Sequence, residues 1–323
     1  MKKELLIDKH GRVHNYLRLS LTERCNLRCR YCMPEEGIDL SPKNAVCTYE
    51  ELLELCDIFI SLGVNKIRLT GGEPLVRKEV GKIIKELGRR PIELALTTNG
   101  FLVDRYINLF KEVGLLNINV SLDTLSPEKF VLITRREGFQ KVYDNIMLLI
   151  REGFNVKINM VLMRGINDDE VIQFAELARD LPVTVRFIEF MPFDGNRWSD
   201  GKMISAQEIR DIITAEYQLN RGTDALNDTT KHYHIPGFNG KIGIISSMSE
   251  HFCGSCNRIR LLSTGKIKNC LFSPDETDLL PPLREGYDIE PLIRNSIYRK
   301  KAQHAGMFNL AKRKNRSMIT IGG

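Results

Sequence analysis

A regular alternation of short β-rich runs and amphipathic stretches constrains the fold more than any other feature of this sequence. Between residue 14 and about residue 191, strands are expected at Tyr16–Leu19, Lys66–Thr70, Glu93–Thr98, Asn117–Leu122, Asn155–Leu162 and Thr184–Met191. Helical patterns lie between them, near 48–62, 77–88, 101–112, 139–152 and 168–180. Strands that alternate with helices indicate parallel βα units in an α/β protein. About six units, rather than eight, predict a partial, incomplete β/α barrel whose ligands gather at the carboxyl ends of the strands.

The rhythm changes after Met191. A turn-rich junction at 192–198 leads to an expected helix at 205–217 and to a β-hairpin over 231–246. We therefore predict two domains, a barrel over residues 1–194 and a smaller C-terminal α+β region over 195–323 that packs over the open barrel mouth. A chain of 323 residues is long enough for this arrangement.

Composition limits the classes of protein that fit. With 42% hydrophobic and 27% charged residues, the chain is ordinary for a globular protein. No apolar run is long enough for a signal peptide or a membrane span, so we expect a soluble cytoplasmic protein with no membrane partner. The net charge of +6 is modest, and the basic runs at 299–301 and 312–316 are interpreted mainly as solvated faces. No nucleic-acid module accompanies them, so no nucleic-acid partner is expected.

Three cysteines near the N-terminus, Cys25, Cys29 and Cys32, have the spacing Cys-x₃-Cys-x₂-Cys. Structural iron–sulfur clusters and structural zinc sites usually take four protein ligands. The nearest histidines, His10 and His14, precede the motif and form no second ligand pair. The spacing therefore favours a 4Fe–4S cluster with one open iron, while a zinc site and three neighbouring core cysteines remain as alternatives.

A second set of three cysteines, Cys253, Cys256 and Cys270, has the spacing Cys-x₂-Cys-x₁₃-Cys. His251 is the only nearby residue that could supply a fourth ligand. A second 4Fe–4S cluster with an open iron is the favoured interpretation, with a zinc site completed by His251 or a set of core cysteines as alternatives. The remaining cysteines, Cys47 and Cys56, receive no role and are expected to be small buried hydrophobes.

The first cysteine motif, with Tyr31 before its last cysteine, resembles the signature of the radical S-adenosylmethionine (SAM) enzymes. The segment Thr70–Pro74 resembles the Gly-Gly-Glu-Pro segment of that superfamily, where glycines let the backbone approach a ligand closely. The resemblance implies that the open iron binds SAM and that an electron from the cluster releases a 5′-deoxyadenosyl radical. It also implies main-chain contacts to SAM at Tyr31 and Gly72, with Ser121 and Met191 lining the ligand.

Both cysteine sets, the run Cys256–Arg260 and the terminal Ile321-Gly322-Gly323 together resemble the molybdenum cofactor biosynthesis protein A family, the GTP 3′,8-cyclases. The resemblance implies that the second cluster binds the guanine of GTP and that arginines, whose planar fork suits phosphate, hold the triphosphate. The matching GTP positions are Arg18, Arg68, Thr97, Lys157, Arg258, Ile259 and Arg260. A structural salt bridge is the alternative role of each arginine.

The implied activity is the conversion of GTP to (8S)-3′,8-cyclo-7,8-dihydroguanosine 5′-triphosphate, the first step of molybdenum cofactor biosynthesis. Expected partners are an external electron donor (flavodoxin or ferredoxin) and the next enzyme of the pathway, and a homodimer is also considered. The tail residues Gly322 and Gly323 are expected to reach the active site and to act in catalysis; a frayed terminus is the alternative. Two other functions stay open: a peptide-modifying radical SAM enzyme, and an iron–sulfur or zinc scaffold that binds nucleotide or RNA.

Overall fold

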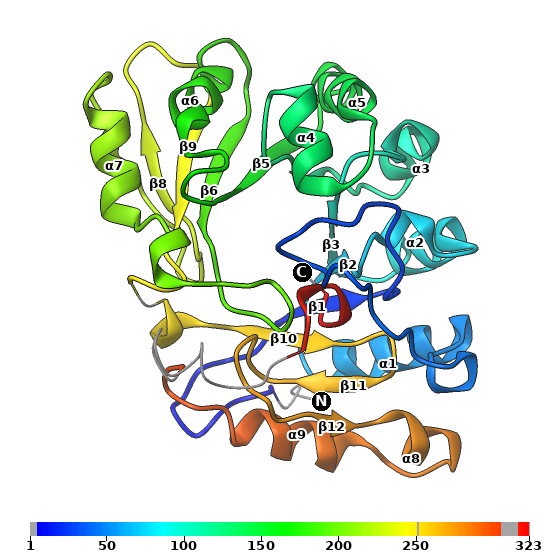
Figure 1. The fold of residues 1–323 in the computed structure, drawn as a ribbon. Coiled ribbons are helices and arrows are strands. Elements are labelled where there is room, and N and C mark those ends of the chain that lie inside the picture. Colours follow the sequence, from blue (N-terminus) through cyan, green and yellow to red (C-terminus); the bar gives the residue numbers. More distant parts are fainter. Residues whose placement is uncertain (1–4, 251, 305–315, 323) are drawn as a thin grey trace.

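One sheet of twelve strands organises the computed structural model, which describes residues 5–250, 252–304 and 316–322 (Figure 1). The strand order is β12-β11-β10-β1-β2-β3-β4-β5-β6-β9-β8-β7. The strands are β1 (Tyr16–Ser20), β2 (Lys66–Thr70), β3 (Glu93–Thr98), β4 (Asn117–Ser121), β5 (Asn155–Leu162), β6 (Thr184–Glu189), β7 (Asn220–Arg221), β8 (Lys231–His234), β9 (Lys241–Ile245), β10 (Arg258–Leu261), β11 (Lys266–Lys268) and β12 (Thr277–Asp278). The α-helices are α1 (Tyr49–Ser61), α2 (Val80–Gly88), α3 (Ile107–Glu112), α4 (Pro127–Thr134), α5 (Phe139–Arg151), α6 (Val171–Asp180), α7 (Ala206–Thr214), α8 (Leu280–Arg284) and α9 (Glu290–Tyr298).

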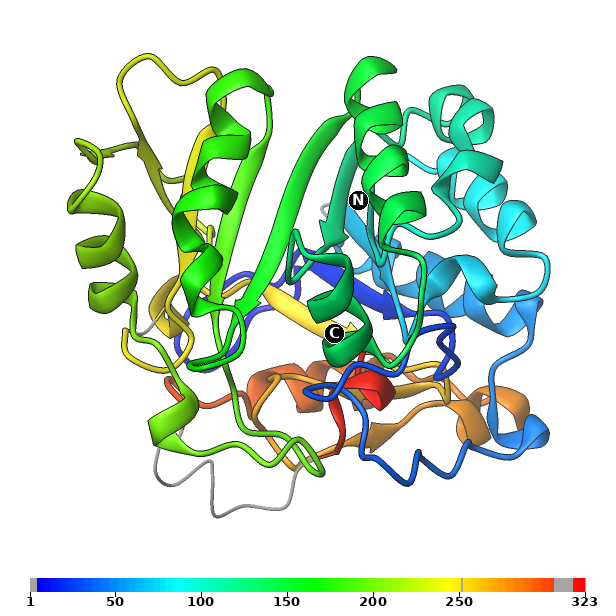
Figure 2. The same ribbon diagram turned by 45° about the horizontal axis from the view of Figure 1, so that its top comes forward.

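The centre of the sheet is parallel. Strands β1 to β6 pair in chain order, and every one of these pairs is parallel. Helices α1 to α6 lie outside the curved sheet, as Figures 1 and 2 show from two directions. In the described part of the chain, the sheet has two ends, β12 and β7, which are not paired with each other. The predicted α/β class with a large parallel sheet is confirmed.

All six strands expected before residue 191 are present, with ends that move by at most two residues. Helix α4 was not predicted, although Ser126 and Pro127 form a helix start that could have been recognised: the Ser126 hydroxyl accepts from the Lys129 amide, and proline occupies the first turn. Three expected helices begin later than predicted: α2 starts at Val80, and 3-10 turns at Val103–Arg105 and Asp168–Glu170 take the first residues expected for α3 and α6.

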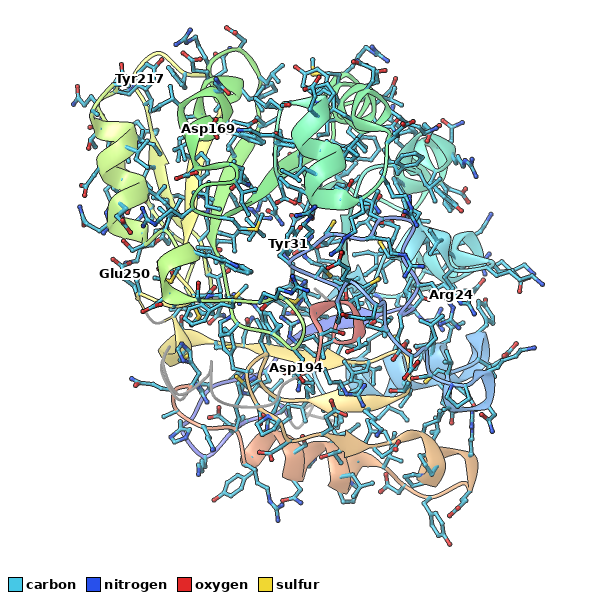
Figure 3. The ribbon with its side chains drawn as sticks, viewed as in Figure 1. Arg24, Tyr31, Asp169, Asp194, Tyr217 and Glu250 are labelled. Atoms are coloured by element: carbon cyan, nitrogen blue, oxygen red, sulfur yellow. The ribbon has the colours of Figure 1, made fainter. Side chains whose placement is uncertain are left out.

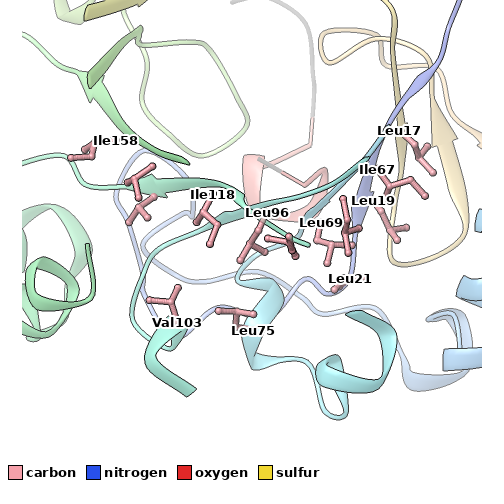
Figure 4. Packing of buried hydrophobic residues seen from close by; sticks show 14 of the residues in the cluster. Leu17, Leu19, Leu21, Ile67, Leu69, Leu75, Leu96, Val103, Ile118 and Ile158 are labelled. Carbon is pink, nitrogen blue, oxygen red and sulfur yellow. The ribbon is translucent and has the colours of Figure 1, made fainter. Parts of the chain in front are cut away.

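Strict alternation in β1 separates the two faces of the sheet. Leu17 and Leu19 are fully buried on the face that packs against the helices, as Figure 4 shows together with Ile67 and Leu69 of β2. Successive side chains of a strand point to opposite faces, so Arg18 points to the inner face. The hydrophobic core therefore lies outside the sheet, and polar and charged side chains occupy its inner side.

The C-terminal part of the chain adds strands at both sides of the parallel centre. The predicted hairpin is confirmed as the antiparallel pair β8 and β9. Strand β9 also pairs in parallel with β6, and β10 pairs in parallel with β1. These two pairings were not predicted, since nothing local in the sequence specifies them. The domain boundary at residue 194 stays a prediction.

Candidate active site

The first three cysteines lie in a loop that leaves the carboxyl end of β1. Within this loop, the Cys29 carbonyl accepts hydrogen bonds from the amides of Cys32 and Met33, both at 3.0 Å. The amides of Arg28 and Arg30 donate to the carbonyls of Thr134 and Ile133, both at 2.9 Å, at the end of α4. The unpredicted helix α4 thus supports the loop from both sides of Cys29.

The three thiols have raised pKa values. Burial raises the pKa of Cys25 to about 11. Burial, together with the nearby Asp123 carboxyl and the neighbouring thiols, also raises the pKa values of Cys29 and Cys32. The thiols are therefore protonated at neutral pH, and binding of iron would release protons.

The donor set of this loop suits an iron–sulfur cluster. None of the three thiols is in a disulfide, and each is partly accessible to solvent. Among the described residues, no three His, Cys, Asp or Glu side chains form a ready site for a single metal ion. A cubane cluster distributes three thiolates over three irons, so it does not require that closer grouping.

Two glycines after β2 allow the backbone to pass close to the cysteine loop. A Cβ at Gly72 would lie 2.4 Å from the Arg24 carbonyl oxygen, and one at Gly71 would lie 2.7 Å from that of Thr22. The Gly72 amide donates to the Thr22 carbonyl at 2.7 Å, and the Glu73 amide donates to the Arg24 carbonyl at 2.9 Å. The sequence argument assigned the glycines to a close ligand contact, but here the close contact is with the protein backbone.

Tyr31, Ser121 and Met191 lie at the carboxyl-end side of the sheet. Figure 3 shows Tyr31 on the first cysteine loop. Its hydroxyl donates to the Asp123 carboxyl at 2.9 Å, which orients the ring. Burial raises the pKa of Asp123 to about 6. Ser121 ends β4, and Met191 packs beside an apolar cluster that contains Ile321 of the tail. Asp123 was not predicted from the sequence; its position two residues after Ser121 was the available signal.

Cationic side chains from several neighbouring strands share the inner face of the sheet. Arg18 lies opposite Arg260 of β10 on one side and opposite Arg68 of β2 on the other. Lys157 of β5 and Arg186 of β6 occupy the same face farther along. Four of the predicted GTP-binding side chains, together with Arg186, are thus brought onto one surface.

Burial, together with repulsion from neighbouring arginines, lowers the pKa values of Arg18 and Arg186. Burial, aided by Arg68 and Arg258, lowers the pKa of Arg18 to about 10. Burial and Arg68 lower the pKa of Arg186 to about 9. Burial opposes ionisation of Tyr16, but Arg68, Arg18 and Arg258 outweigh it and lower the pKa of that phenol to about 7. Such a surface favours an anionic ligand.

Sequence reasoning missed Tyr16 and Arg186. Tyr16 accepts a hydrogen bond from Arg68 Nε at 2.6 Å. Arg186 is 8% exposed, and its Nη2 has no hydrogen-bond partner among the described residues. For Arg186 the available signal was the one that identified Arg18: an arginine between apolar neighbours in a strand. Thr97 lies nearby, and its hydroxyl is 3.5 Å from the Asn119 amide nitrogen.

The second cysteine set lines a cavity at the opposite end of the parallel strands. Cys253 and Cys256 precede β10, whose first residue, Arg258, lies opposite Tyr16 at the start of β1. Cys270 follows β11, and all three cysteines line one cavity with Arg258 and Arg260. Ile259 between these arginines is fully buried on the other face, so only its main chain is available to a ligand there.

Two side chains that the sequence argument did not assign complete this cavity. Lys300 is 3% exposed, and its Nζ donates to Cys256 Sγ at 3.3 Å and to the Arg258 carbonyl at 2.8 Å. Burial opposes ionisation of Cys256, but Lys300 and Arg258 outweigh it and lower the pKa of that thiol. His304 also lines the cavity, whereas His251, which would complete the alternative zinc site, lies outside the described residues.

The C-terminal tail reaches the end of the sheet where the first cysteine loop begins. Gly322 has a φ of +72°, and a Cβ there would lie 2.7 Å from Thr70 Oγ1 and 3.0 Å from Ser20 Cβ. Arg260 Nη1 donates to the Gly322 carbonyl at 2.6 Å. Gly323 lies outside the described residues. Arg260 therefore contacts the tail as well as the second cavity.

Two family models cover most of the chain. Residues 19–178 match the radical SAM superfamily, and residues 183–306 match the family described as Molybdenum Cofactor Synthesis C. The fold is similar to that of SuiB from Streptococcus suis bound to S-adenosylmethionine, with a TM-score of 0.58 at 15% identity over 89% of this chain and 69% of that chain. The cysteine loop at the carboxyl ends of parallel strands, together with the superfamily match, identifies a radical SAM enzyme. A 4Fe–4S cluster and SAM are the cofactors that this class implies.

Full-length relatives identify the family more narrowly. The chain is 50% identical to the "GTP 3′,8-cyclase, mitochondrial" of Arabidopsis thaliana over 99% of this chain and 84% of the plant protein. It is 45% identical to the GTP 3′,8-cyclase of Syntrophomonas wolfei, over 98% of this chain and the whole bacterial protein. The chain belongs to the GTP 3′,8-cyclase family of molybdenum cofactor biosynthesis. In the described residues we find no helix of sufficient length and apolarity to span a membrane, and the cytoplasmic location stays a prediction.

Proposed function

We propose that this chain converts GTP to (8S)-3′,8-cyclo-7,8-dihydroguanosine 5′-triphosphate, using two 4Fe–4S clusters at opposite ends of a partial β/α barrel. The observation that carries the proposal is the cationic inner face, which lies between the two cysteine sets. A bound triphosphate would offset the repulsion from neighbouring arginines that helps to lower the pKa values of Arg18 and Arg186. The barrel would correspond to residues 1–194 and the auxiliary region to residues 195–323.

The first cysteine loop would hold the cluster that binds SAM, through Cys25, Cys29 and Cys32. When bound, this cluster and SAM supply the 5′-deoxyadenosyl radical that removes hydrogen from the ribose 3′ carbon of GTP. The protein's own contribution would be to hold SAM in position. The main chain at Tyr31 and Gly72 would contact SAM, while Ser121 and Met191 would line it.

The second set, Cys253, Cys256 and Cys270, would hold the cluster that binds guanine. The base would then lie at one end of the inner face, with the triphosphate directed toward the cations. The GTP contacts would be Arg18, Arg68, Thr97, Lys157, Arg258, the Ile259 main chain and Arg260. Carbon 8 of the base and the ribose 3′ carbon would then face each other within the enclosed interior, where water is excluded.

The tail would help to complete this enclosure. Gly322 fills the space beside Ser20 and Thr70, where a larger residue would not fit. Because Arg260 binds the Gly322 carbonyl, tail position and triphosphate position would be coupled. We assign Gly322 and Gly323 a role in the cyclisation step.

Anaerobic incubation with SAM, dithionite and GTP tests the proposal, with nucleotide products separated by chromatography and iron measured in the same sample. About eight irons per chain and a cyclised nucleotide are the expected result. A Cys56→Ala variant is the matched control, because Cys56 is buried away from both sites and should leave product and iron unchanged. Stoichiometric zinc in place of iron would overturn the proposal. SAM cleavage that yields no cyclised nucleotide in the presence of GTP would also overturn it.

A further inference from the structure

An exposed face formed by α4 and the outer side of the first cysteine loop has no role in the proposed reaction. Val131 and Leu132 on α4 are 43% and 45% exposed, although both are large apolar residues. Arginines surround them on the loop and on the turn after α4. We call this surface the α4–loop face; it consists of Arg28, Arg30, Val131, Leu132, Arg135 and Arg136.

The arginines of this face form no ion pair with any carboxylate in residues 5–250, 252–304 or 316–322. Their side-chain hydrogen bonds are with neutral groups. Arg135 Nη1 donates to the Arg28 carbonyl at 2.9 Å, and Arg136 Nη1 donates to the Arg135 carbonyl at 2.8 Å. The four arginines outnumber the two exposed carboxylates on the same segments, Glu128 and Glu137, so the face carries a net positive charge with an apolar pair among the charges. Figure 3 shows Arg24 and Tyr31 at opposite ends of the loop.

The same face lies directly against the site of the first cluster. Arg28 and Arg30 flank Cys29 in the chain, and their amides are hydrogen-bonded to the end of α4. A group that docks at the end of α4 therefore lies beside the backbone that carries Cys29. A neighbouring groove is also mainly basic: Arg30, Arg135, Arg197 and Lys202 line it, and one carboxylate there, Glu35, pairs with Arg197 at 3.3 Å.

We propose that the α4–loop face is the docking site of an acidic one-electron carrier protein, which reduces the first cluster. The proposal rests on the proposed function. The carrier is oxidised by one electron as the cluster gains one. A small apolar centre with a charged rim is typical of a transient protein contact, and opposite charge increases the rate of encounter. An acidic carrier is favoured over a second copy of this chain, because the chain carries a net charge of +6 and would repel itself there.

A double variant, Leu132→Ser with Arg136→Glu, tests this proposal without altering a cysteine or a backbone contact of the loop. The matched control is Leu116→Ser with Arg151→Glu. Leu116 is 42% exposed and lies before β4, at the other end of the sheet from the cysteine loop. Arg151 ends α5 and is also exposed. Each double variant replaces one exposed leucine by serine and one exposed arginine by glutamate, so the two variants change surface apolarity and charge equally.

SAM cleavage is measured with two reductants, dithionite and a chemically reduced flavodoxin of net negative charge. With flavodoxin at low ionic strength, the α4–loop variant should be about tenfold slower than the unmodified chain, and the difference should shrink as salt is added. With dithionite, the rates should be equal. The control variant should match the unmodified chain with both reductants.

Direct binding gives a second readout that does not depend on turnover. Titration of oxidised flavodoxin into the cluster-loaded protein should show weaker binding for the α4–loop variant only. Equal flavodoxin rates for both double variants would overturn the docking proposal. A dimer in sedimentation that the α4–loop variant dissociates would also overturn it, in favour of an interface between two copies. Absence of dithionite-driven cleavage in the unmodified chain would instead count against the proposed function.

Discussion

The two cysteine sets are built in different ways. Cys25, Cys29 and Cys32 lie within eight residues of one loop. The second set combines Cys253 and Cys256 before β10 with Cys270 after β11, and its cavity is completed by Lys300 and by Arg12 from the chain's start. A local motif can be recognised from spacing alone, whereas an assembled site needs the fold to bring its parts together.

Electrostatics separates the two regions as well. Around the first set, burial and the Asp123 carboxyl raise the pKa values of the thiols, and no cation offsets them there to a comparable degree. Around the second set, Lys300 and Arg258 lower the pKa of Cys256 despite burial. The first site would therefore depend on iron binding to stabilise its thiolates, whereas at the second site the protein supplies part of that stabilisation for Cys256.

The largest expected effect is the loss of one cluster at a time. Cys29→Ser should abolish reductive SAM cleavage, because a hydroxyl is a poor ligand for the cluster. Cys256→Ser should still cleave SAM slowly but should fail to cyclise GTP. The measurement is 5′-deoxyadenosine and nucleotide product from the same reaction. Full cyclase turnover by Cys256→Ser would show that the second set does not bind substrate.

The tail is the next region to test, since Arg260 of β10 lines the second cavity and also binds the Gly322 carbonyl of the tail. Deleting Gly322 and Gly323 should preserve both clusters and GTP binding, while product formation collapses. Gly322→Ala should act in the same direction but more weakly, since its φ of +72° and the contact with Thr70 both disfavour a Cβ. Product yield per SAM cleaved is the measurement. An unchanged cyclisation rate in the truncated protein would remove the tail from the mechanism.

Asp8 offers a way to disturb the second region alone. It is 4% exposed, and its carboxyl pairs with Arg12 at 2.6 Å and with His14 at 3.0 Å. Arg12 in turn donates to the Cys253 carbonyl at 2.6 Å. Asp8→Asn should lower the free energy of unfolding by about 3–5 kcal/mol, because Arg12 loses its buried partner.

Urea unfolding and iron content measure the Asp8→Asn effect. The second cluster should become labile while the first one is retained. Arg294→Gln is a control, since Arg294 pairs with Glu290 on the surface of α9 and should cost little. Equal loss of both clusters would indicate a general folding defect.

Alanine substitutions at Arg258 and Arg260 should both weaken GTP binding, but only the one at Arg260 should also release the tail. Each substitution by alanine should weaken GTP binding by about 1.5–3 kcal/mol, the range for a hydrogen bond to a charged group. Arg260→Ala should also release the tail, since it removes the bond to the Gly322 carbonyl. Calorimetry with GTP and with SAM tests this difference. Comparable losses of SAM affinity in both variants would contradict separate ligand sites.

The smallest effect is a pH dependence of stability from His14. Burial, aided by the positive charge of Lys300, lowers the pKa of His14 to about 4. Between this value and the usual pKa near 6.5, the unfolded chain binds more protons than the folded one, so stability falls as the pH falls. Urea unfolding at pH 7 and pH 5 should differ by about 2 kcal/mol from this group. His14→Gln should flatten that slope; an unchanged slope would assign it to other groups.

Much of this protein could be predicted from its sequence. Alternating patterns predicted the six strands β1 to β6, because a buried apolar face repeats along each strand and helix in a way that needs no partner to be recognised. The radical SAM class and the cyclase family followed from two cysteine spacings and a few short segments, and the comparisons confirmed both. The individual contacts to SAM and GTP stay predictions.

Only the tertiary structure decided how the distant parts meet. The parallel pairings of β10 with β1 and of β9 with β6 join strands far apart in the chain. They align Arg18 with Arg260, bring Lys300 to Cys256 and let Gly322 reach Thr70. Local sequence carries no record of such contacts, because a strand specifies which of its faces is apolar and not which neighbour will cover its edge.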